Sequence, residues 1–281
     1  MVKYLLLFFI TIFSSYSFAF AKTNEHLFVI SSVVINAGTN KKINNFVDMI
    51  EKDTGYKLKP FYVNSYDRLS EILRKNPDSL AWTCGLPYIE DSLKDNQQLV
   101  AVPLYNEKPT YSSFIVARKD DTRKNFTDFK NSIFSYSDIR SNSGYLAPAV
   151  FLKKNGFNID EFFRVKILTG THEDSIKSVY NGLADVAAID EYVWIEYIKS
   201  RPHISDKLYV IEKTGPYPFT PIVAGSAMTE QTLKKIRSSL VNMNKSKLKT
   251  FKNDFNMDGF ILKNKSFYNP IQQMLNYVNG K

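Results

Sequence analysis

The chain has 281 residues, of which 44% are hydrophobic and 14% aromatic, and it carries 37 lysines and arginines against 28 aspartates and glutamates. This apolar fraction is that of an ordinary globular protein and excludes a disordered, collagen-like or low-complexity chain. A single cysteine excludes a disulfide framework, and the three histidines lie far apart without metal-ligand spacing, so we expect no metal and no cofactor. The net charge of +9 favours an anionic partner without identifying it.

Residues 1–21 have the features of a secretory signal peptide. Lys3 supplies a positive charge, an apolar run follows from Leu5 to Phe13, and residues 19–21 read Ala-Phe-Ala, the small-residue pattern that signal peptidase cleaves. The run is too short to span a bilayer, which needs about 20 apolar residues. We therefore expect cleavage after Ala21 and a mature protein in the periplasm, where nucleic acid is not a partner. An uncleaved N-terminal anchor is the alternative.

Predicted strands and helices alternate along the rest of the chain. A strand at 27–34 precedes a helix at 40–54, in which apolar residues recur at helical spacing and which Gly55 ends. A strand at 56–63 and a helix at 66–75 repeat the pattern. Further strands are predicted at 80–83, 99–102, 114–117, 133–136, 165–168, 186–189, 208–211 and 222–224, and further helices at 147–155, 174–181, 192–200 and 232–243. Repeated β-α units with short connections predict an α/β fold with largely parallel sheets.

The segment 140–145, Arg-Ser-Asn-Ser-Gly-Tyr, lies between a predicted strand and a predicted helix. The start of a helix exposes unpaired backbone N–H groups that attract oxyanions. Serine hydroxyls add donors, and Gly144 lets a ligand approach the backbone closely. Pro148 lacks an N–H group and crowds the carbonyl four residues earlier, which loosens the first turn. Plain capping of the helix by Ser141 or Ser143 is the alternative, and this segment alone favours it.

Residues 168–174 form a second turn from strand to helix. Thr171 and Asp174 fit a capping box, which places His172 in the first helical turn, near exposed amides. An imidazole there can donate a hydrogen bond to an oxyanion, and a bound anion favours its protonated form. A surface histidine beside a cap is the alternative. Two such turns in one domain are expected to face one crevice at the carboxyl ends of parallel strands.

Several motifs, in order, resemble those of one family. Residues 141–148 are similar to the Ser-Thr-Ser-Gly-x-x-x-Pro motif of periplasmic phosphonate- and phosphite-binding proteins of ABC transporters. The stretch 169–176 looks like that family's Gly-x-His motif, and 181–188 resembles its Asn-x-x-Val-Asp-x-Ala strand. Residues 80–88 and 111–116 resemble the strand and loop of the first domain and the crossing strand. The set covers nearly the whole mature chain.

The resemblance implies a type II periplasmic-binding-protein fold, with two α/β lobes joined by crossing strands and a ligand cleft between them. Lobe 1 is expected at 22–118 with 217–281, and lobe 2, with the anion-binding turns, at 119–216. The implied function is binding of a small phosphorus oxyanion (phosphonate, phosphite or phosphate) by a monomer that delivers it to an inner-membrane ABC permease. A periplasmic sensory or accessory protein that reuses the fold is the alternative.

Catalysis is not expected. Ser143, His172 and Asp174 are the residue types of a hydrolase, but the chain has no Gly-x-Ser-x-Gly elbow, and an anion site accounts for the same groups. Carried over by position, the resemblance instead implies ligand-binding roles for Ser141, Asn142, Ser143 and His172 in one lobe and for Tyr66, Tyr111 and Trp82 or Thr83 in the other.

Two features of these positions depart from or weaken the pattern. Asn142 replaces the usual threonine, and the aromatic candidates have a common alternative as packed core. Aminophosphonate binders of the family add carboxylates that pair with the ligand's ammonium group. At the corresponding places this chain has Tyr192, preceded by Asp190 and Glu191, and Thr220. We therefore expect a preference for amine-free ligands.

Overall fold

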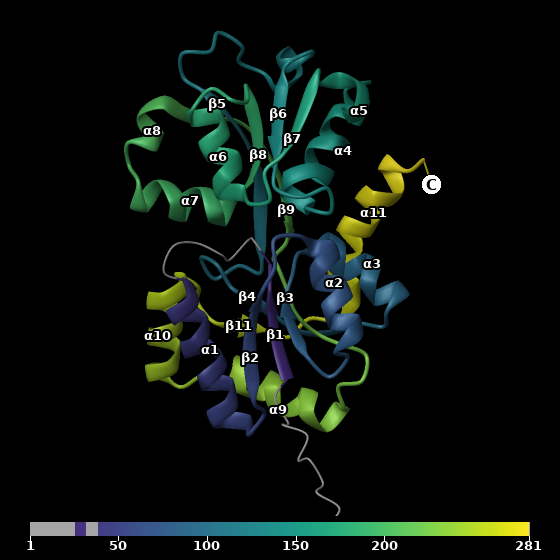
Figure 1. Cartoon of the computed structure of the whole chain (residues 1–281), viewed down its shortest axis with the longest axis vertical. Coiled ribbons are helices and arrows are strands. Elements are labelled where there is room, and N and C mark those ends of the chain that lie inside the picture. Colours follow the sequence, from purple (N-terminus) through teal and green to yellow (C-terminus); the bar gives the residue numbers. More distant parts are fainter. Residues whose placement is uncertain (1–25, 32–38, 281) are drawn as a thin grey trace, which may run out of the picture.

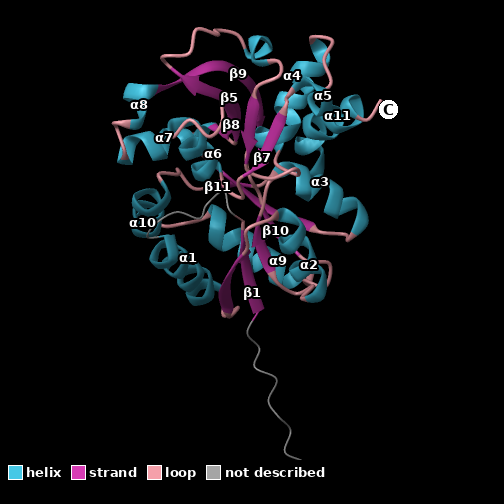
Figure 2. Cartoon of the chain, turned by 45° about the horizontal axis from the view of Figure 1, so that its top comes forward, coloured by secondary structure: helices cyan, strands magenta, loops and turns pink. Residues whose placement is uncertain are grey.

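The computed structural model describes residues 26–31 and 39–280, so the predicted leader and its anchor alternative lie outside the described residues. Two β-sheets follow one another along the long axis of the molecule, and helices cover both faces of each sheet (Figures 1 and 2). Within the described ranges, no helix combines the length and apolarity needed to cross a membrane.

The first sheet has the strand order β11-β4-β10-β3-β1-β2. Strand β1 pairs in parallel with β2 and β3, whereas β10 runs antiparallel between β3 and β4, and β11 is antiparallel to β4. We call this sheet and its helices the six-stranded lobe. Its strands are β1 (His26–Ile30), β2 (Leu58–Tyr62), β3 (Leu80–Trp82), β4 (Gln98–Pro103), β10 (Ile222–Ala224) and β11 (Phe260–Ile261), and its helices are α1 (Thr39–Thr54), α2 (Tyr66–Lys75), α3 (Gly85–Lys94), α9 (Glu230–Val241) and α10 (Lys245–Phe255).

The second sheet has the order β7-β6-β8-β5-β9 and belongs to the five-stranded lobe. Strand β6 pairs in parallel with β7 and β8, and β5 is antiparallel to β8 and β9. The strands are β5 (Thr110–Arg118), β6 (Ile133–Tyr136), β7 (Val165–Leu168), β8 (Val186–Asp190) and β9 (Leu208–Pro218). The helices are η1 (Phe126–Phe129), η2 (Asn142–Leu146), α4 (Ala147–Lys154), α5 (Ile159–Phe162), α6 (His172–Tyr180), α7 (Glu191–Ser200) and α8 (Ile204–Lys207).

The chain crosses between the lobes from β4 to β5 and returns from β9 to β10. A strand that enters a sheet from the other lobe runs away from the cleft, whereas the strands of the β-α units end at it. Strands β5 and β10 therefore run opposite to most of their neighbours. Both sheets are mixed, which corrects the prediction that they are largely parallel. After η3 (Lys265–Tyr268), the C-terminal α11 (Asn269–Val278) packs on α3 of one lobe and α4 of the other.

Buried apolar side chains fill both faces of the second sheet. Along β5, Ile115 belongs to the core under α4, and its neighbour Val116 belongs to the core under α6 and α7. This alternation follows from the two-residue period of a strand, and it explains why β8 is buried along its whole length. The six-stranded lobe has its own core, in which Phe46, Phe251 and Phe260 pack together.

Most predicted elements are present with shifted ends, but three features depend on tertiary contacts. Helices α3 and α11 have no predicted counterpart, since Pro87 and Pro270 in their first turns weaken the helical signal. The strand predicted at 208–211 extends to Pro218, because it pairs with β5 beyond Gly215. The helix predicted at 174–181 begins at His172, with Thr171 as its cap.

Candidate functional site

The loop after β6 forms a wide helical turn before α4. Ser141 caps this turn, and its Oγ accepts a hydrogen bond from the N–H of Gly144 at 3.0 Å. The N–H of Ala147 donates to the carbonyl of Asn142, which is the spacing of a π-turn. Pro148 supplies no N–H to tighten the turn, so the loosened start predicted for this helix is present. A Cβ on Gly144 would lie 2.7 Å from Oγ of Ser137, so only glycine fits here.

Two side chains of this turn carry buried polar atoms without partners. Asn142 and Ser143 are both buried, and neither Oδ1 of Asn142 nor Oγ of Ser143 has a hydrogen-bond partner among the described residues. Nδ2 of Asn142 donates to the hydroxyl of Tyr111 at 3.1 Å, and the carbonyl of Ser143 accepts from Oγ of Ser113 at 2.7 Å. The turn is thus fixed by its backbone, and side-chain groups remain free for a ligand.

His172 lies at the start of α6 and is buried beside the same turn. Its Nδ1 accepts the N–H of Asp190 at 3.3 Å, and its Nε2 lies 3.3 Å from Oγ of Ser137. Because Nδ1 is an acceptor, the proton of the neutral ring is on Nε2. Burial lowers the pKa of His172 to about 3, so the ring of the unliganded protein is a neutral donor.

The six-stranded lobe contributes Tyr66 and Thr83, which are buried and unpartnered. The hydroxyl of Tyr66 and Oγ1 of Thr83 have no hydrogen-bond partner among the described residues, and both side chains are about 1% exposed. Burial, with Cys84 and Asp138 nearby, raises the pKa of Tyr66, and burial also raises that of Tyr111. Both phenols therefore remain protonated and able to donate.

Trp82 and Thr83 were alternatives in the sequence, and the structure places them differently. Nε1 of Trp82 donates to Oγ1 of Thr220 at 3.3 Å, and its ring packs against Phe46 and Phe255 in the core of the six-stranded lobe. Its only N–H group is therefore occupied. Oγ1 of Thr83 is free, and Thr83 is the member of the pair that can donate to a ligand.

Reasoning from sequence missed Ser31, which follows β1 and is buried with an unpartnered Oγ. Ser31 follows the carboxyl end of β1 as Thr83 follows that of β3, and these two strands are neighbours. The carboxyl ends of parallel strands are where ligands bind in α/β sheets, so position was the available signal. Buried polar groups are nearly always paired, which makes this unpartnered set unusual. The set comprises Ser31, Tyr66, Thr83, Asn142 and Ser143.

The two halves of this set meet across the interface between the lobes. The N–H of Asn142 in the five-stranded lobe lies 3.5 Å from Sγ of Cys84 in the six-stranded lobe. The N–H of Tyr66 donates to Oδ2 of Asp138 at 3.0 Å, again between the lobes. The structure thus brings together all of the predicted ligand-binding residues except the indole of Trp82. No cluster in the described ranges has the His, Cys, Asp and Glu content of a metal site.

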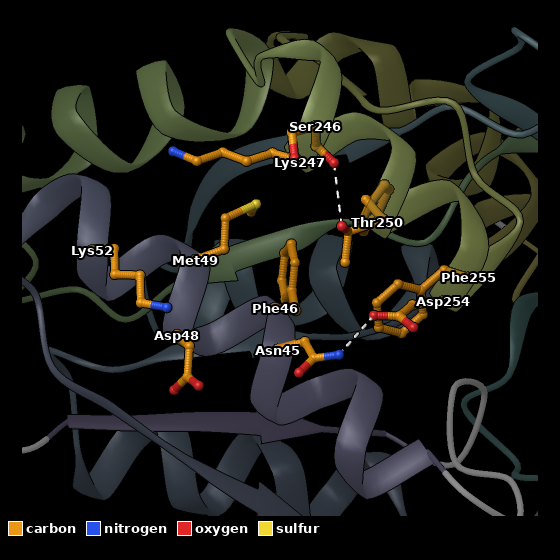
Figure 3. Close-up of a pocket in the computed structure, with 11 residues that line it drawn as sticks. Asn45, Phe46, Asp48, Met49, Lys52, Ser246, Lys247, Thr250, Asp254 and Phe255 are labelled. Carbon is orange, nitrogen blue, oxygen red and sulfur yellow. Dashed lines mark hydrogen bonds between the residues drawn. The ribbon is translucent and has the colours of Figure 1, made fainter.

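A separate groove lies between α1 and α10 (Figure 3). Its volume is about 320 Å³, its floor includes Phe46 and Met49, and Lys52 and Lys247 lie along its sides. Nδ2 of Asn45 donates to Oδ2 of Asp254 at 3.1 Å across one end. The groove contains none of the residues predicted to bind ligand.

Comparisons with known proteins agree with this geometry. Residues 28–268 match the model of a family described as ABC transporter, phosphonate, periplasmic substrate-binding protein. The phosphonates-binding periplasmic protein of Escherichia coli (strain K12) is 28% identical over 207 residues, which cover 72% of this chain and 61% of that protein's length. The probable ABC transporter phosphite binding protein PhnD1 of Prochlorococcus marinus (strain MIT 9301) is 24% identical over 252 residues, 85% of each chain.

Solved structures share the fold. A binding protein component of an ABC phosphonate transporter from Pseudomonas aeruginosa superimposes with a TM-score of 0.83 at 22% identity, over 91% of this chain and 86% of that one. PhnD1 from Prochlorococcus marinus in complex with methylphosphonate gives 0.81 at 23% identity, over 91% and 98%. The predicted type II periplasmic-binding-protein fold, with two α/β lobes joined by crossing strands, is confirmed.

Proposed function

Since the chain belongs to the family of periplasmic substrate-binding proteins of phosphonate ABC transporters, we propose that it binds a small phosphorus oxyanion between its lobes. The observation that carries the proposal is the set of buried, unpartnered polar groups from both lobes. Hydroxyls of Ser31, Tyr66, Thr83 and Ser143 and the Nε2–H of His172 are donors, and an oxyanion with three oxygens accepts several hydrogen bonds at once. Ser141 caps the turn and keeps its hydroxyl proton for the same anion.

Neutral donors suit this task. Burying a formal charge is costly, whereas hydroxyls and a neutral imidazole donate to an anion without that cost. The relatives named above are described as binding phosphonates, phosphite and methylphosphonate, and the ligand proposed here is of that class. The protein binds its ligand without turnover.

We propose further that the ligand lacks an amine. The hydroxyl of Tyr192 donates to the carbonyl of Phe255 at 2.7 Å, and Thr220 accepts from Trp82. The two neighbouring acids have other roles, because Asp190 caps α7 and Glu191 pairs with Lys213 at 3.0 Å. An ammonium group buried here would lose its hydration without gaining a free carboxylate partner.

The transport role follows from the family. We propose that residues 1–21 direct export, that residues 22–118 with 217–281 form one lobe and 119–216 the other, and that the mature monomer delivers its ligand to an inner-membrane ABC permease. Both crossings between the lobes lie near these boundaries.

Calorimetry on the mature protein tests the proposal. Phosphate, phosphite and methylphosphonate are titrated in turn, with sulfate as a control anion. We expect one of the phosphorus oxyanions to bind with 1:1 stoichiometry and a dissociation constant in the micromolar range or below, which corresponds to about −8 kcal/mol or better. The absence of both heat and thermal stabilisation with every one of them contradicts the proposal.

A further inference from the structure

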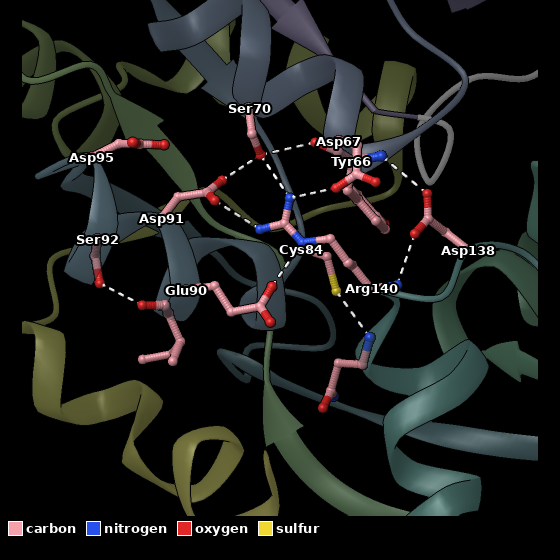
Figure 4. A network of polar contacts seen from close by, with 12 residues as sticks. Tyr66, Asp67, Ser70, Cys84, Glu90, Asp91, Ser92, Asp95, Asp138 and Arg140 are labelled. Carbon is pink, nitrogen blue, oxygen red and sulfur yellow. Dashed lines mark hydrogen bonds and ion pairs between the residues drawn. The ribbon is translucent and has the colours of Figure 1, made fainter. Parts of the chain in front are cut away.

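Arg140, which immediately precedes the anion-binding turn, extends its side chain out of the five-stranded lobe and into the six-stranded lobe (Figure 4). Its Nε donates to Oε2 of Glu90 at 2.7 Å, and its Nη2 donates to Oδ1 of Asp91 at 2.7 Å. Its Nη1 donates to Oγ of Ser70 at 2.8 Å and to Oδ1 of Asp67 at 3.2 Å. All four partners lie on α2 and α3, so the guanidinium is bound entirely by the opposite lobe.

The centre of this cluster is buried. The side chain of Arg140 is 15% exposed and that of Asp91 is 4% exposed. Burial alone lowers the pKa of Arg140, but the charges of Asp91 and Glu90 outweigh this effect and raise it, so the guanidinium stays charged. Ser70 and Gln97 also donate to Oδ2 of Asp91. Charge-assisted hydrogen bonds in such surroundings are stronger than those of exposed ion pairs.

The backbone on either side of Arg140 is tied to the same interface. The N–H of Arg140 donates to Oδ1 of Asp138 at 2.7 Å, and Oδ2 of that carboxylate accepts the N–H of Tyr66 at 3.0 Å. The N–H of Ser141 donates to the carbonyl of Asp138 at 3.0 Å. One peptide bond separates Arg140 from the turn, so the contact that joins the lobes also sets where the turn lies relative to Tyr66 and Thr83.

We propose that Arg140 is a positioning residue that holds the two lobes closed and thereby places the anion-binding turn against the six-stranded lobe. The proposal rests on the proposed function, because it takes the space between the lobes as the ligand site. Contacts that exist only in the closed arrangement shift the equilibrium toward it. When the competent state is less populated, apparent affinity falls by the same factor, although Arg140 itself does not touch the ligand.

The test compares Arg140→Gln with Arg74→Gln. Arg74 is a matched control, because it makes a two-pronged pair with Asp95 at 3.0 and 2.9 Å between α2 and α3, within one lobe. Both variants lose one positive charge. Small-angle X-ray scattering of the ligand-free proteins reports closure, and calorimetry with methylphosphonate reports affinity.

For Arg140→Gln we expect a larger radius of gyration without ligand and affinity weakened by roughly tenfold, within the usual range of coupling between sites. Arg74→Gln is expected to match the wild type in both measurements. Glu90→Gln removes one partner that is 35% exposed and leaves the buried pair with Asp91, so it folds even if the first variant does not. It is expected to change both quantities in the same direction by a smaller amount.

Unchanged scattering overturns the proposal, and so does unchanged affinity in a protein that has opened. Equal effects of the Arg140 and Arg74 changes overturn it as well, since net charge would then explain the result. If the wild type binds no phosphorus oxyanion, the proposed function fails, while scattering still shows whether Arg140 holds the lobes closed.

Discussion

The backbone N–H of Asp190 donates a hydrogen bond to Nδ1 of His172 across 3.3 Å. Asp190 ends β8 and caps α7, and His172 begins α6, so the bond joins the carboxyl end of a strand to the start of a neighbouring helix. It sets the tautomer of the ring and directs Nε2–H toward the anion-binding turn. Two local features of the fold thereby produce one neutral hydrogen-bond donor.

The buried neutral state of His172 predicts a pH-dependent stability. Burial lowers the pKa of His172 to about 3 in the folded protein, against about 6.5 in the unfolded chain. The unfolded chain therefore binds the extra proton between these values. The stability contributed by the neutral ring is complete above about pH 6.5 and is lost as the pH falls toward 3, by up to about 1.4 kcal/mol per pH unit.

Urea unfolding of the wild type and of His172→Gln at several pH values measures this effect. The difference in unfolding free energy between the two proteins is expected to shrink as the pH falls from 6.5. Burial raises the pKa of Asp190 to about 7, which gives a slope of opposite sign, but Asp190 is present in both proteins. His203→Gln changes an exposed histidine and serves as the control. A pH-independent difference for His172→Gln contradicts the assignment.

Ser141 and Ser143 are expected to respond differently to alanine. Oγ of Ser141 accepts the N–H of Gly144, so Ser141→Ala loses a cap and lowers stability by about 1 kcal/mol, besides weakening ligand binding. Oγ of Ser143 has no partner, so Ser143→Ala leaves the unliganded protein as stable as before. It is expected to lose about 1.5–3 kcal/mol of binding, or roughly ten- to 150-fold in affinity. Thermal melts and calorimetry separate the two; a destabilised Ser143→Ala protein would argue for a structural role.

Selectivity against an amine can be measured by competition. An amine-free phosphonate or phosphite is expected to bind at least tenfold more tightly than 2-aminoethylphosphonate, a difference of about 1.4 kcal/mol, because no free carboxylate faces the ligand. The opposite preference would mean that Asp190 or Glu191 pairs with the ammonium group. Asp190→Asn and Glu191→Gln would then show which, since only one of them would abolish the preference.

Gly144 is expected to tolerate no side chain. A Cβ there would lie 2.7 Å from Oγ of Ser137 and 2.9 Å from Oγ of Ser141, so Gly144→Ala is expected to destabilise the protein by about 1–3 kcal/mol. Removing one obstacle with Ser137→Gly in the same chain should recover part of the loss. Denaturant unfolding of the single and double variants measures both, and a Gly144→Ala protein of wild-type stability would show that the turn can shift.

Local patterns in the sequence were enough for much of the fold and part of the site. Apolar periodicity predicted most strands and helices, and the cap at Thr171 and the loose turn before Pro148 are present as expected. These features depend on residues within one or two helical turns of each other, whose backbone hydrogen bonding is decided locally. The order of motifs along the chain indicated the family.

Tertiary structure decided which side chains are free and which are committed. Trp82 and Thr83 are adjacent in sequence, yet packing occupies the indole and leaves the hydroxyl unpartnered. Ser31 had no motif, and it joins the site only because β1 lies beside β3. Arg140 belonged to the anion-binding segment in the sequence, but its guanidinium is held by α2 and α3, about 50 to 70 residues away along the chain. Such pairings arise from chain crossings that bring distant segments together, and no local period encodes them.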